Sequence, residues 1–143
     1  MNKDVIGKRV KLKSYVNLVD NENVHHYVYK ILDNVTSDEI GSVMLYKPEE
    51  IDKFLYCGNV GMKIKEEYQG KGYATEAFEL AKEILKELGF EKVIMTCEIN
   101  NINSYKNLSN HVGAKYIGRK KVPEDDSMYS DDFKEVEIFE KEI

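Results

Sequence analysis

The sequence predicts an α+β or mixed α/β domain built on a largely antiparallel sheet. Several segments alternate apolar and polar residues as strands do, and one long segment has the apolar spacing of an amphipathic helix. Strands, helix, strand, short helix and strands follow one another, with no repeat or linker between them. At 143 residues the chain is long enough to bury a core, so we expect one domain over residues 1–143.

The first predicted strand is residues 9–16, RVKLKSYV, in which apolar and charged side chains alternate. The turn-forming residues 17–23, NLVDNEN, follow it. Residues 24–32 are rich in β-branched and aromatic side chains and form the second predicted strand. Alternation places Val24, His26 and Val28 on one face of this strand and His25, Tyr27, Tyr29 and Ile31 on the other.

Two further strands are predicted before a glycine-rich segment. Residues 40–46 form the third strand, and Pro48 ends it. Residues 49–56 fit either one helical turn or a lead-in to the next strand, so both interpretations stay open. Residues 59–66 form the fourth strand and run directly into the glycines. The apolar face of the fourth strand carries Val60, Met62 and Ile64.

The most regular helical pattern lies after the glycines. Apolar side chains recur every three or four residues from Ala74 to Leu88, and Gly89 stands where a helix C-terminal glycine belongs. The pattern consists of Ala74, Ala77, Phe78, Ala81, Ile84, Leu85 and Leu88. Residues 92–99 then predict a strand with Val93, Met95, Cys97 and Ile99 on one face and Ile94, Thr96 and Glu98 on the other.

The last part of the chain predicts one short helix and two strands. An Asn-rich turn, NNIN, precedes a helix from about Ser104 to Gly113. Residues 114–122 and 135–142 form the closing strands around the polar loop PEDDSMYSDD. The central sheet is therefore expected to have about six to seven strands.

Composition and charge exclude several classes of protein. With 42% hydrophobic and 33% charged residues, the chain is neither disordered nor fibrous. Its net charge of −5 argues against a general affinity for nucleic acid, which needs clustered Lys and Arg. The N-terminus has no apolar leader and no run approaches the about 18 residues of a membrane span, so we expect no membrane partner. Cys57 and Cys97 lack the spacing of a metal or redox pair, which favours a reduced, cytoplasmic protein.

Residues 66–77, EEYQGKGYATEA, place two glycines between a strand and a helix that begins near Gly72. Unpaired backbone N–H groups and the positive end of the helix would suit a phosphate or pyrophosphate there. Glycines at such a junction also serve packing, so both interpretations stay open for the loop alone. A phosphate-loop NTPase would need Ser or Thr after Lys71, and a dinucleotide fingerprint would need glycine at Thr75.

The stretch Gln69-Gly70-Lys71-Gly72-Tyr73-Ala74 resembles the Q/R-x-x-G-x-G/A signature of the GNAT N-acetyltransferases, and of a mostly uncharacterised subgroup in particular. The similarity extends over residues 58–118 and includes an N-x-x-S motif at residues 101–104. The resemblance implies a GNAT-type fold with a mixed, largely antiparallel central sheet flanked by helices. It also implies acetyl-CoA as cosubstrate, no metal, and an amine of a small molecule or peptide as acceptor.

The resemblance further implies where acetyl-CoA would bind. Loop N–H groups would hold the pyrophosphate, and the pantetheine arm would lie where residues 62–64 diverge from residues 96–98. An N–H near Met62 or Lys63 would polarise the thioester carbonyl. The implied cofactor-binding residues are Met62, Lys63, Ile64, Gln69, Gly70, Lys71, Gly72, Tyr73, Ala74, Thr75, Asn101 and Ser104.

Acylation of an amine requires a base, because an alkyl amine with a pKa of about 10 is mostly protonated at neutral pH. Glu98 is the candidate base, and a solvent-facing carboxylate is the alternative. Leu108 stands where many relatives carry a tyrosine that protonates the leaving thiolate. Ser104 and Tyr105 are the other catalytic candidates; the alternatives are a helix N-cap for Ser104 and packing for Tyr105.

Several other side chains have structural as well as functional explanations. His25 and His26 point to opposite faces of a strand and cannot share a metal site, and His111 fits a helix end. Cys97 fits a buried small side chain better than a nucleophile. Strand packing and an acceptor pocket both explain Tyr27, Tyr29 and Tyr46.

The acceptor side departs from the family pattern. Relatives place two helices between the first and second strands, but only residues 17–24 are available here, so these helices are reduced or absent. The acceptor site would then be open or completed by a second subunit, as in a homodimer. The loop of residues 123–132 could draw a cationic acceptor, or its carboxylates could simply face solvent. These carboxylates belong to Glu124, Asp125, Asp126, Asp131 and Asp132.

We therefore expect an N-acetyltransferase that passes an acetyl group from acetyl-CoA directly to a primary amine. The alternative is a non-catalytic acyl-CoA-binding module that kept the glycine loop and lost the acid. A small interaction domain without a ligand is the third candidate. No residue pattern specifies the acceptor or the length of the acyl chain.

Overall fold

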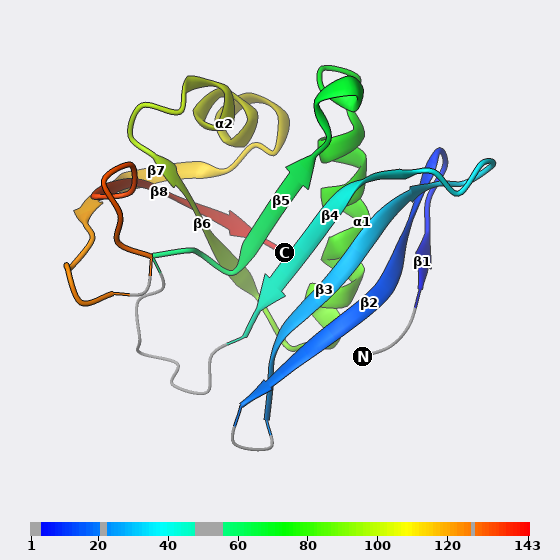
Figure 1. The fold of residues 1–143 in the computed structure, drawn as a ribbon, viewed down its shortest axis with the longest axis horizontal. Helices are drawn as coiled ribbons and strands as arrows, with labels where there is room; N and C mark the ends of the chain where they lie inside the picture. Colours follow the sequence, from blue (N-terminus) through cyan, green and yellow to red (C-terminus); the bar gives the residue numbers. More distant parts are fainter. Residues whose placement is uncertain (1–3, 21–22, 48–55, 127) are drawn as a thin grey trace.

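The computed structural model describes residues 4–20, 23–47, 56–126 and 128–143, with residues 16–20 and 23–25 described by their backbone only. Two antiparallel sheets meet at one end and diverge at the other (Figure 1). The first sheet consists, in spatial order, of β1 (Val5–Ile6), β2 (Val10–Asp20), β3 (Asn23–Asp33), β4 (Glu39–Tyr46) and β5 (Val60–Ile64). The second consists of β6 (Lys92–Glu98), β8 (Glu135–Glu142) and β7 (Lys115–Lys121). The helices are η1 (Glu66–Tyr68), α1 (Tyr73–Glu87), α2 (Ile102–Lys106) and the π-helical η2 (Asn107–His111).

The predicted fold class is confirmed, although the strands form two sheets, of five and three strands, where one central sheet of about six to seven was expected. The hairpin of β2 and β3 also differs from the prediction. Residues 17–23 were expected to form a turn, but Asn17 pairs with Tyr27 and Val19 pairs with Val24. A bulge between Leu18 and Val19 restores the register and lets the long hairpin continue. Only residues 21–22 separate the two strands, so the described chain has no helices between them.

Smaller differences have local causes. The two-residue strand β1 was not predicted, because two residues are too few to show an alternating pattern. The helix expected from Ser104 begins at Ile102, because Asn101 caps it. The ambiguous segment 49–56 lies outside the described residues except for Tyr56.

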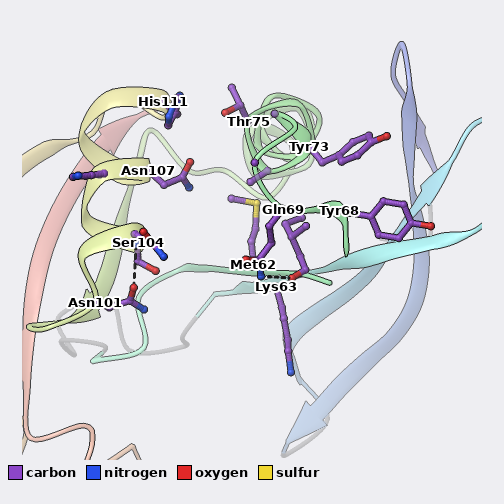
Figure 2. A pocket seen from close by; sticks show the side chains of 16 residues that line it. Met62, Lys63, Tyr68, Gln69, Tyr73, Thr75, Asn101, Ser104, Asn107 and His111 are labelled. Atoms are coloured by element: carbon purple, nitrogen blue, oxygen red, sulfur yellow. Dashed lines mark hydrogen bonds between the residues drawn. The ribbon is translucent and has the colours of Figure 1, made fainter. Parts of the chain in front are cut away.

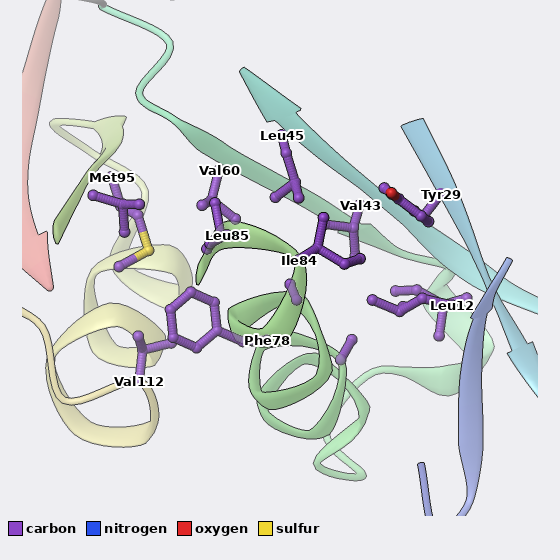
Figure 3. Close-up of a cluster of buried hydrophobic side chains, with 14 of the residues drawn as sticks. Leu12, Tyr29, Val43, Leu45, Val60, Phe78, Ile84, Leu85, Met95 and Val112 are labelled. Atoms are coloured by element: carbon purple, nitrogen blue, oxygen red, sulfur yellow. The ribbon is translucent and has the colours of Figure 1, made fainter. Parts of the chain in front are cut away.

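The main core lies between the first sheet and the apolar face of α1 (Figure 3). Phe78, Ala81 and Leu85 of α1 are at most 1% exposed. Gly89 ends the helix with φ of +93°, and Phe90 N–H donates to Leu85 O at 3.0 Å, as in a Schellman motif. The helix meets buried side chains from the sheet, namely Leu12, Tyr29, Val43, Leu45 and Val60.

The predicted strand faces agree with this core. Tyr27 and Tyr29 are 8% and 0% exposed, so strand packing explains them and they line no acceptor pocket. The side chain of His25 lies outside the described residues. A second, smaller cluster covers the other face of the second sheet and anchors the loop after β7. Its buried members are Val122, Val136 and Ile138. No helix in the described ranges is long and apolar enough to cross a membrane.

Asn59 joins the two sheets at the point from which they diverge. Its backbone N–H donates to Ile94 O at 2.7 Å, and its Oδ1 accepts from Ile94 N at 2.8 Å. Toward the other sheet, its Nδ2 donates to Tyr46 O at 3.1 Å and its carbonyl accepts from Tyr46 N at 2.8 Å. A side chain at the neighbouring Gly58 would lie 2.8 Å from Ile94 O, so this approach of the backbone requires glycine. Among the described strands no ladder joins β5 to β6 beyond this junction.

Replacing Asn59 with Ala should destabilise the protein by about 2–3 kcal/mol, because it leaves a buried N–H and a buried carbonyl without their partners. The midpoint of urea unfolding would fall while its slope stays constant. Asn110→Ala, at an exposed position of η2, is the matched control and should change the free energy of unfolding little. An equal midpoint for the Asn59 variant and wild type would show that the junction does not depend on this amide.

Candidate active site

A cleft of about 790 Å³ opens where β5 and β6 diverge. Its walls are β5, the glycine loop at the start of α1, and the α2–η2 segment (Figure 2). Every predicted cofactor-binding residue except Lys71 lines it. Sequence reasoning missed the other lining residues, which are Tyr68, Asn103, Lys106, Asn107 and His111.

The glycine loop presents a run of unused backbone donors to the cleft. Gly70 and Gly72 have φ of +74° and +82°, and Gly72 is the N-cap of α1 without a side-chain cap. In the described part of the chain, nothing accepts a hydrogen bond from the amides of residues 70–75. The positive end of a 15-residue helix reinforces these donors. The loop therefore has the donor set of an anion site, and pyrophosphate fits it.

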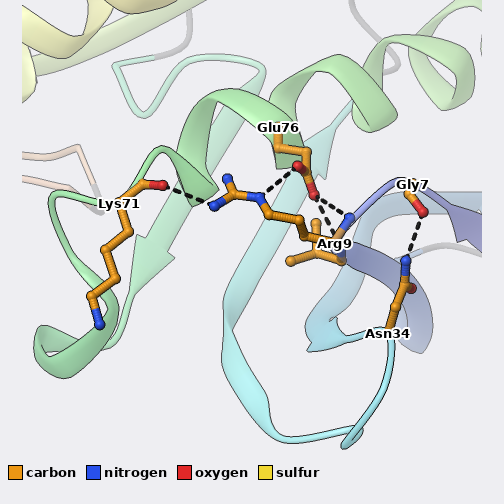
Figure 4. A network of polar contacts seen from close by, with 6 residues as sticks. Gly7, Arg9, Asn34, Lys71 and Glu76 are labelled. Carbon is orange, nitrogen blue, oxygen red and sulfur yellow. Dashed lines mark hydrogen bonds and ion pairs between the residues drawn. The ribbon is translucent and has the colours of Figure 1, made fainter.

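A network behind the loop holds it in place (Figure 4). Glu76, in the first turns of α1, accepts from the backbone N–H groups of Arg9 and Val10 at 3.1 and 3.0 Å. Its other carboxylate oxygen accepts from Arg9 Nε at 3.0 Å. The Arg9 guanidinium also donates to Lys71 O at 3.1 Å and stacks 4.5 Å over the Tyr73 ring. Arg9 and Glu76 are far apart in sequence, so no local pattern indicated this pairing.

The free edge of β5 forms one wall of the cleft. Alternate residues of an antiparallel strand direct their backbone groups at the paired neighbour. Lys65 faces β4 in this way, because its N–H donates to Ile40 O at 2.9 Å. By the same alternation Lys63 faces β4, opposite Ser42, and Met62 presents its N–H to the cleft. The two candidates for an oxyanion donor therefore reduce to Met62.

Gln69 fixes the distance between the loop and this edge. Its side-chain Nε2 donates to Ile64 O at 3.0 Å, which is the dashed contact below Gln69 in Figure 2. The amide was expected to contact the cofactor, and this hydrogen bond to β5 uses one of its two N–H donors. Gln69 thus lines the cleft and positions the glycines.

The α2–η2 segment forms the opposite wall. Asn101 is the N-cap of α2, and its Oδ1 accepts from Ser104 N at 3.1 Å. The expectation that Ser104 would be the N-cap is wrong, because Asn101 occupies that position. The Ser104 side chain is therefore free of a capping role and lines the cleft.

A π-helical turn decides which side chains of η2 reach the cleft. Val112 N–H donates to Asn107 O at 2.9 Å, five residues back, which rotates the following positions. Leu108 is 8% exposed and packs in the core, whereas Asn107 and His111 line the cleft. Their spacing from Ser104 along one helix face was the available sequence signal, but the extra residue in the turn was not predictable from it.

The structure places the other catalytic candidates away from this cleft. The Tyr105 ring packs 5.8 Å from Tyr116 and 5.1 Å from Phe139, as its packing alternative predicted. Glu98 lies on the face of β6 opposite the buried Cys97, so it faces outward at the far side of the gap between the sheets. Burial, with a smaller effect of nearby carboxylates, raises the pKa of the Cys97 thiol to about 11, so it stays protonated and unreactive at neutral pH.

In the acidic loop after β7, some of the carboxylates contact groups of the loop itself or of residues close to it in the chain. Asp126 Oδ1 accepts from Met128 N at 2.9 Å, and Asp131 lies 3.8 Å from Lys134 Nζ. The described residues contain no group of three His, Cys, Asp or Glu side chains that could hold a metal ion. The side chains that line the cleft carry amides, hydroxyls, the amino groups of Lys63 and Lys106 and the imidazole of His111.

Comparison with solved structures gives the same architecture at low sequence identity. A GNAT-family acetyltransferase from Bacillus anthracis matches with a TM-score of 0.70 at 15% identity, covering 98% of both chains. A protein from Vibrio cholerae described as a putative ribosomal-protein-serine acetyltransferase matches with a TM-score of 0.68 at 15% identity, covering 99% of this chain and 98% of its own. The microcin C7 self-immunity acetyltransferase, solved with acetyl-CoA and AMP, matches with a TM-score of 0.64 at 18% identity. That match covers 83% of this chain and 62% of the other. No curated protein matches the sequence.

The sequence itself matches a family model. The model describes an acetyltransferase (GNAT) domain and covers residues 6–114, which include β2 to β6, the glycine loop and the α2–η2 segment. The matched residues also contain the motif at residues 69–74 and the two strands, β5 and β6, that diverge. The chain belongs to the GNAT acetyltransferase family.

Proposed function

We propose that this protein is a single-domain N-acetyltransferase, over residues 1–143, that transfers the acetyl group of acetyl-CoA directly to the primary amine of a peptide or small molecule. The observation that carries the proposal is the run of unused N–H groups at residues 70–75 beside the cleft. These donors suit the pyrophosphate, and the cleft from the loop past Met62 suits an extended arm. The microcin C7 enzyme, a structural neighbour, was solved with acetyl-CoA.

The proposed reaction is an attack by a neutral amine on the thioester carbonyl. Glu98, on the outward face of β6, takes the proton from the acceptor ammonium, directly or through water. The amine nitrogen bonds to the carbonyl carbon, and the oxyanion that forms accepts a hydrogen bond from Met62 N–H. The nitrogen loses its second proton to solvent and the carbon–sulfur bond breaks, giving the amide and the thiolate of CoA.

The leaving thiolate needs stabilisation that a tyrosine supplies in many relatives. Leu108 is buried here, so we assign this contact to Ser104 and Asn107 on the cleft wall. A hydroxyl and an amide N–H both donate hydrogen bonds to a thiolate. Solvent can supply the proton afterwards, because a free thiol has a pKa of about 8.5.

Calorimetric titration with acetyl-CoA tests the first step. Wild type should bind with micromolar affinity, and Gly72→Asp should weaken binding at least about tenfold, because it adds a carboxylate that repels the anion beside the loop amides. Gly113→Asp is the matched control, since Gly113 also has a positive φ, +71°, but lies outside the cleft. Absence of binding by wild type would overturn the proposal.

Release of CoA thiol with a mixed panel of amines separates the enzyme from a non-catalytic acyl-CoA-binding module. An enzyme should release thiol in the presence of an acceptor faster than the Gly72→Asp variant does. A module that only binds acyl-CoA would release thiol at the rate of that variant although it binds the cofactor normally.

Replacing Glu98 with Gln should lower kcat about 100-fold or more, because the amine then lacks its base. Binding of acetyl-CoA should stay unchanged, since Glu98 lies outside the cofactor cleft. Glu91→Gln, an exposed carboxylate just before β6, is the control. Full turnover by the Glu98 variant would exclude the residue as the base.

Replacing Glu76 with Ala should weaken acetyl-CoA binding about three- to tenfold. Without the carboxylate the glycine loop is no longer held in place, so part of the binding free energy is needed to order it. Gln at this position keeps an oxygen acceptor and should restore part of the affinity. Glu79→Ala, which removes a carboxylate that lies one turn further along α1 and pairs with Lys82, should have no effect. Equal affinities for the Glu76 and Glu79 variants would show that the network does not position the loop.

A further inference from the structure

The outer face of the first sheet carries a row of basic side chains that leads to the cleft. Directly opposite positions on four adjacent strands are Lys13, Lys30, Ser42 and Lys63. These residues face away from α1, because their neighbours Leu12, Tyr29 and Val43 are fully buried in the core. Lys63 stands on the edge strand β5 and points away from the glycine loop in Figure 2. We call Lys13, Lys30 and Lys63, with Tyr15 and Met44, the lysine face.

Positive charge on this face is only partly compensated. Glu39 lies 3.4 Å from Lys30 Nζ and 3.2 Å from Lys65 Nζ. Hydrogen bonds and charge from Lys65 and Lys30 lower the pKa of the Glu39 carboxyl. Within the described residues, neither Lys13 nor Lys63 forms an ion pair, and lysines directly opposite on adjacent strands repel one another. The chain as a whole carries a net charge of −5, so this face is basic although the protein is acidic overall.

Apolar groups accompany the lysines. Tyr15 is 63% exposed, and Lys30 Nζ lies over its ring, 4.2 Å from the ring centroid. Met44 is 42% exposed, next to Ser42 in the lysine row and opposite Val28. Alternating cationic and apolar contacts suit the side chains of a peptide better than a uniform phosphate backbone. In the described part of the chain no helix lies between β2 and β3, and the side chains of Tyr15 and Met44 are exposed on this face.

We infer that the lysine face binds an acidic peptide whose acceptor amine enters the gap between the sheets beside Lys63. The inference rests on the proposed transferase function and assigns its acceptor. Adjacent strands lie about 4.8 Å apart, which places Lys30 and Lys13 about 10 and 14 Å from Lys63. An extended peptide covers these distances in about three and four residues. The carboxylates should therefore stand at about the third to fifth positions of the peptide.

Fluorescence anisotropy tests this surface without requiring turnover. The probes are labelled ten-residue peptides with a free N-terminus that carry Asp or Glu at positions 3–5, the same residues at positions 8–10, or Lys at positions 3–5. The first should bind most tightly, and its affinity should fall with added salt. Lys13→Gln/Lys30→Gln should weaken it about tenfold. The double variant Lys115→Gln/Lys121→Gln makes the same charge change on β7 and should have no effect.

Three results would overturn the inference. The first is equal affinity for the acidic and Lys-containing peptides, and the second is equal loss in the two double variants. The third is a wild type that sediments as a dimer and a Lys13/Lys30 variant that sediments as a monomer, which would make the face a subunit interface. Titration of the same samples with acetyl-CoA tests the proposed function separately from this inference. A protein that binds acetyl-CoA but does not prefer the acidic peptide would overturn the inference and leave the proposed function standing.

Discussion

Asn59 joins the two sheets, and the shape of the cleft depends on this junction. Hydrogen bonds from this buried residue reach both Tyr46 and Ile94, so β5 and β6 start side by side. They then separate, and two strand edges keep backbone groups that no neighbouring strand uses. Free edges normally invite unwanted pairing, and proteins protect them. Here the edges face a cleft whose proposed ligand covers them, so the exposed backbone has a use.

The loop above the cleft is held from two sides while its donors stay free. Glu76 and Arg9 fix it from the back, and Gln69 ties it to the β5 edge. Both sets of contacts use side chains or carbonyl oxygens, and neither consumes an N–H of residues 70–75. The proposed anion site is therefore held in place without a ligand, which would lower the entropy cost of binding.

The sequence was sufficient for features that depend on local patterns. Alternation indicated the strands and their buried faces, helical spacing indicated α1, and the motif at residues 69–74 indicated the family and most residues of the cleft. Features that depend on distant pairing were out of reach. The Arg9–Glu76 network joins residues on opposite sides of the first hairpin, and no periodicity encodes it. Leu108 packs in the core and Asn107 lines the cleft, and the π turn that begins at Asn107 shifts the side chains after it, which no sequence pattern indicated.

The two sides of the gap between β5 and β6 differ in the groups proposed to bind ligands there. Backbone groups predominate on one side and side chains on the other, and this difference affects how acceptor specificity can change. On the α1 side the proposed cofactor contacts come mostly from backbone N–H groups, which persist when side chains change. On the outer side the lysine face and the proposed base Glu98 would act through side chains that stand on regular strands. Such positions can be substituted without disturbing the core, because their neighbours on the other face carry the packing. Acceptor preference can therefore change by surface substitution while the fold and the cofactor site stay constant.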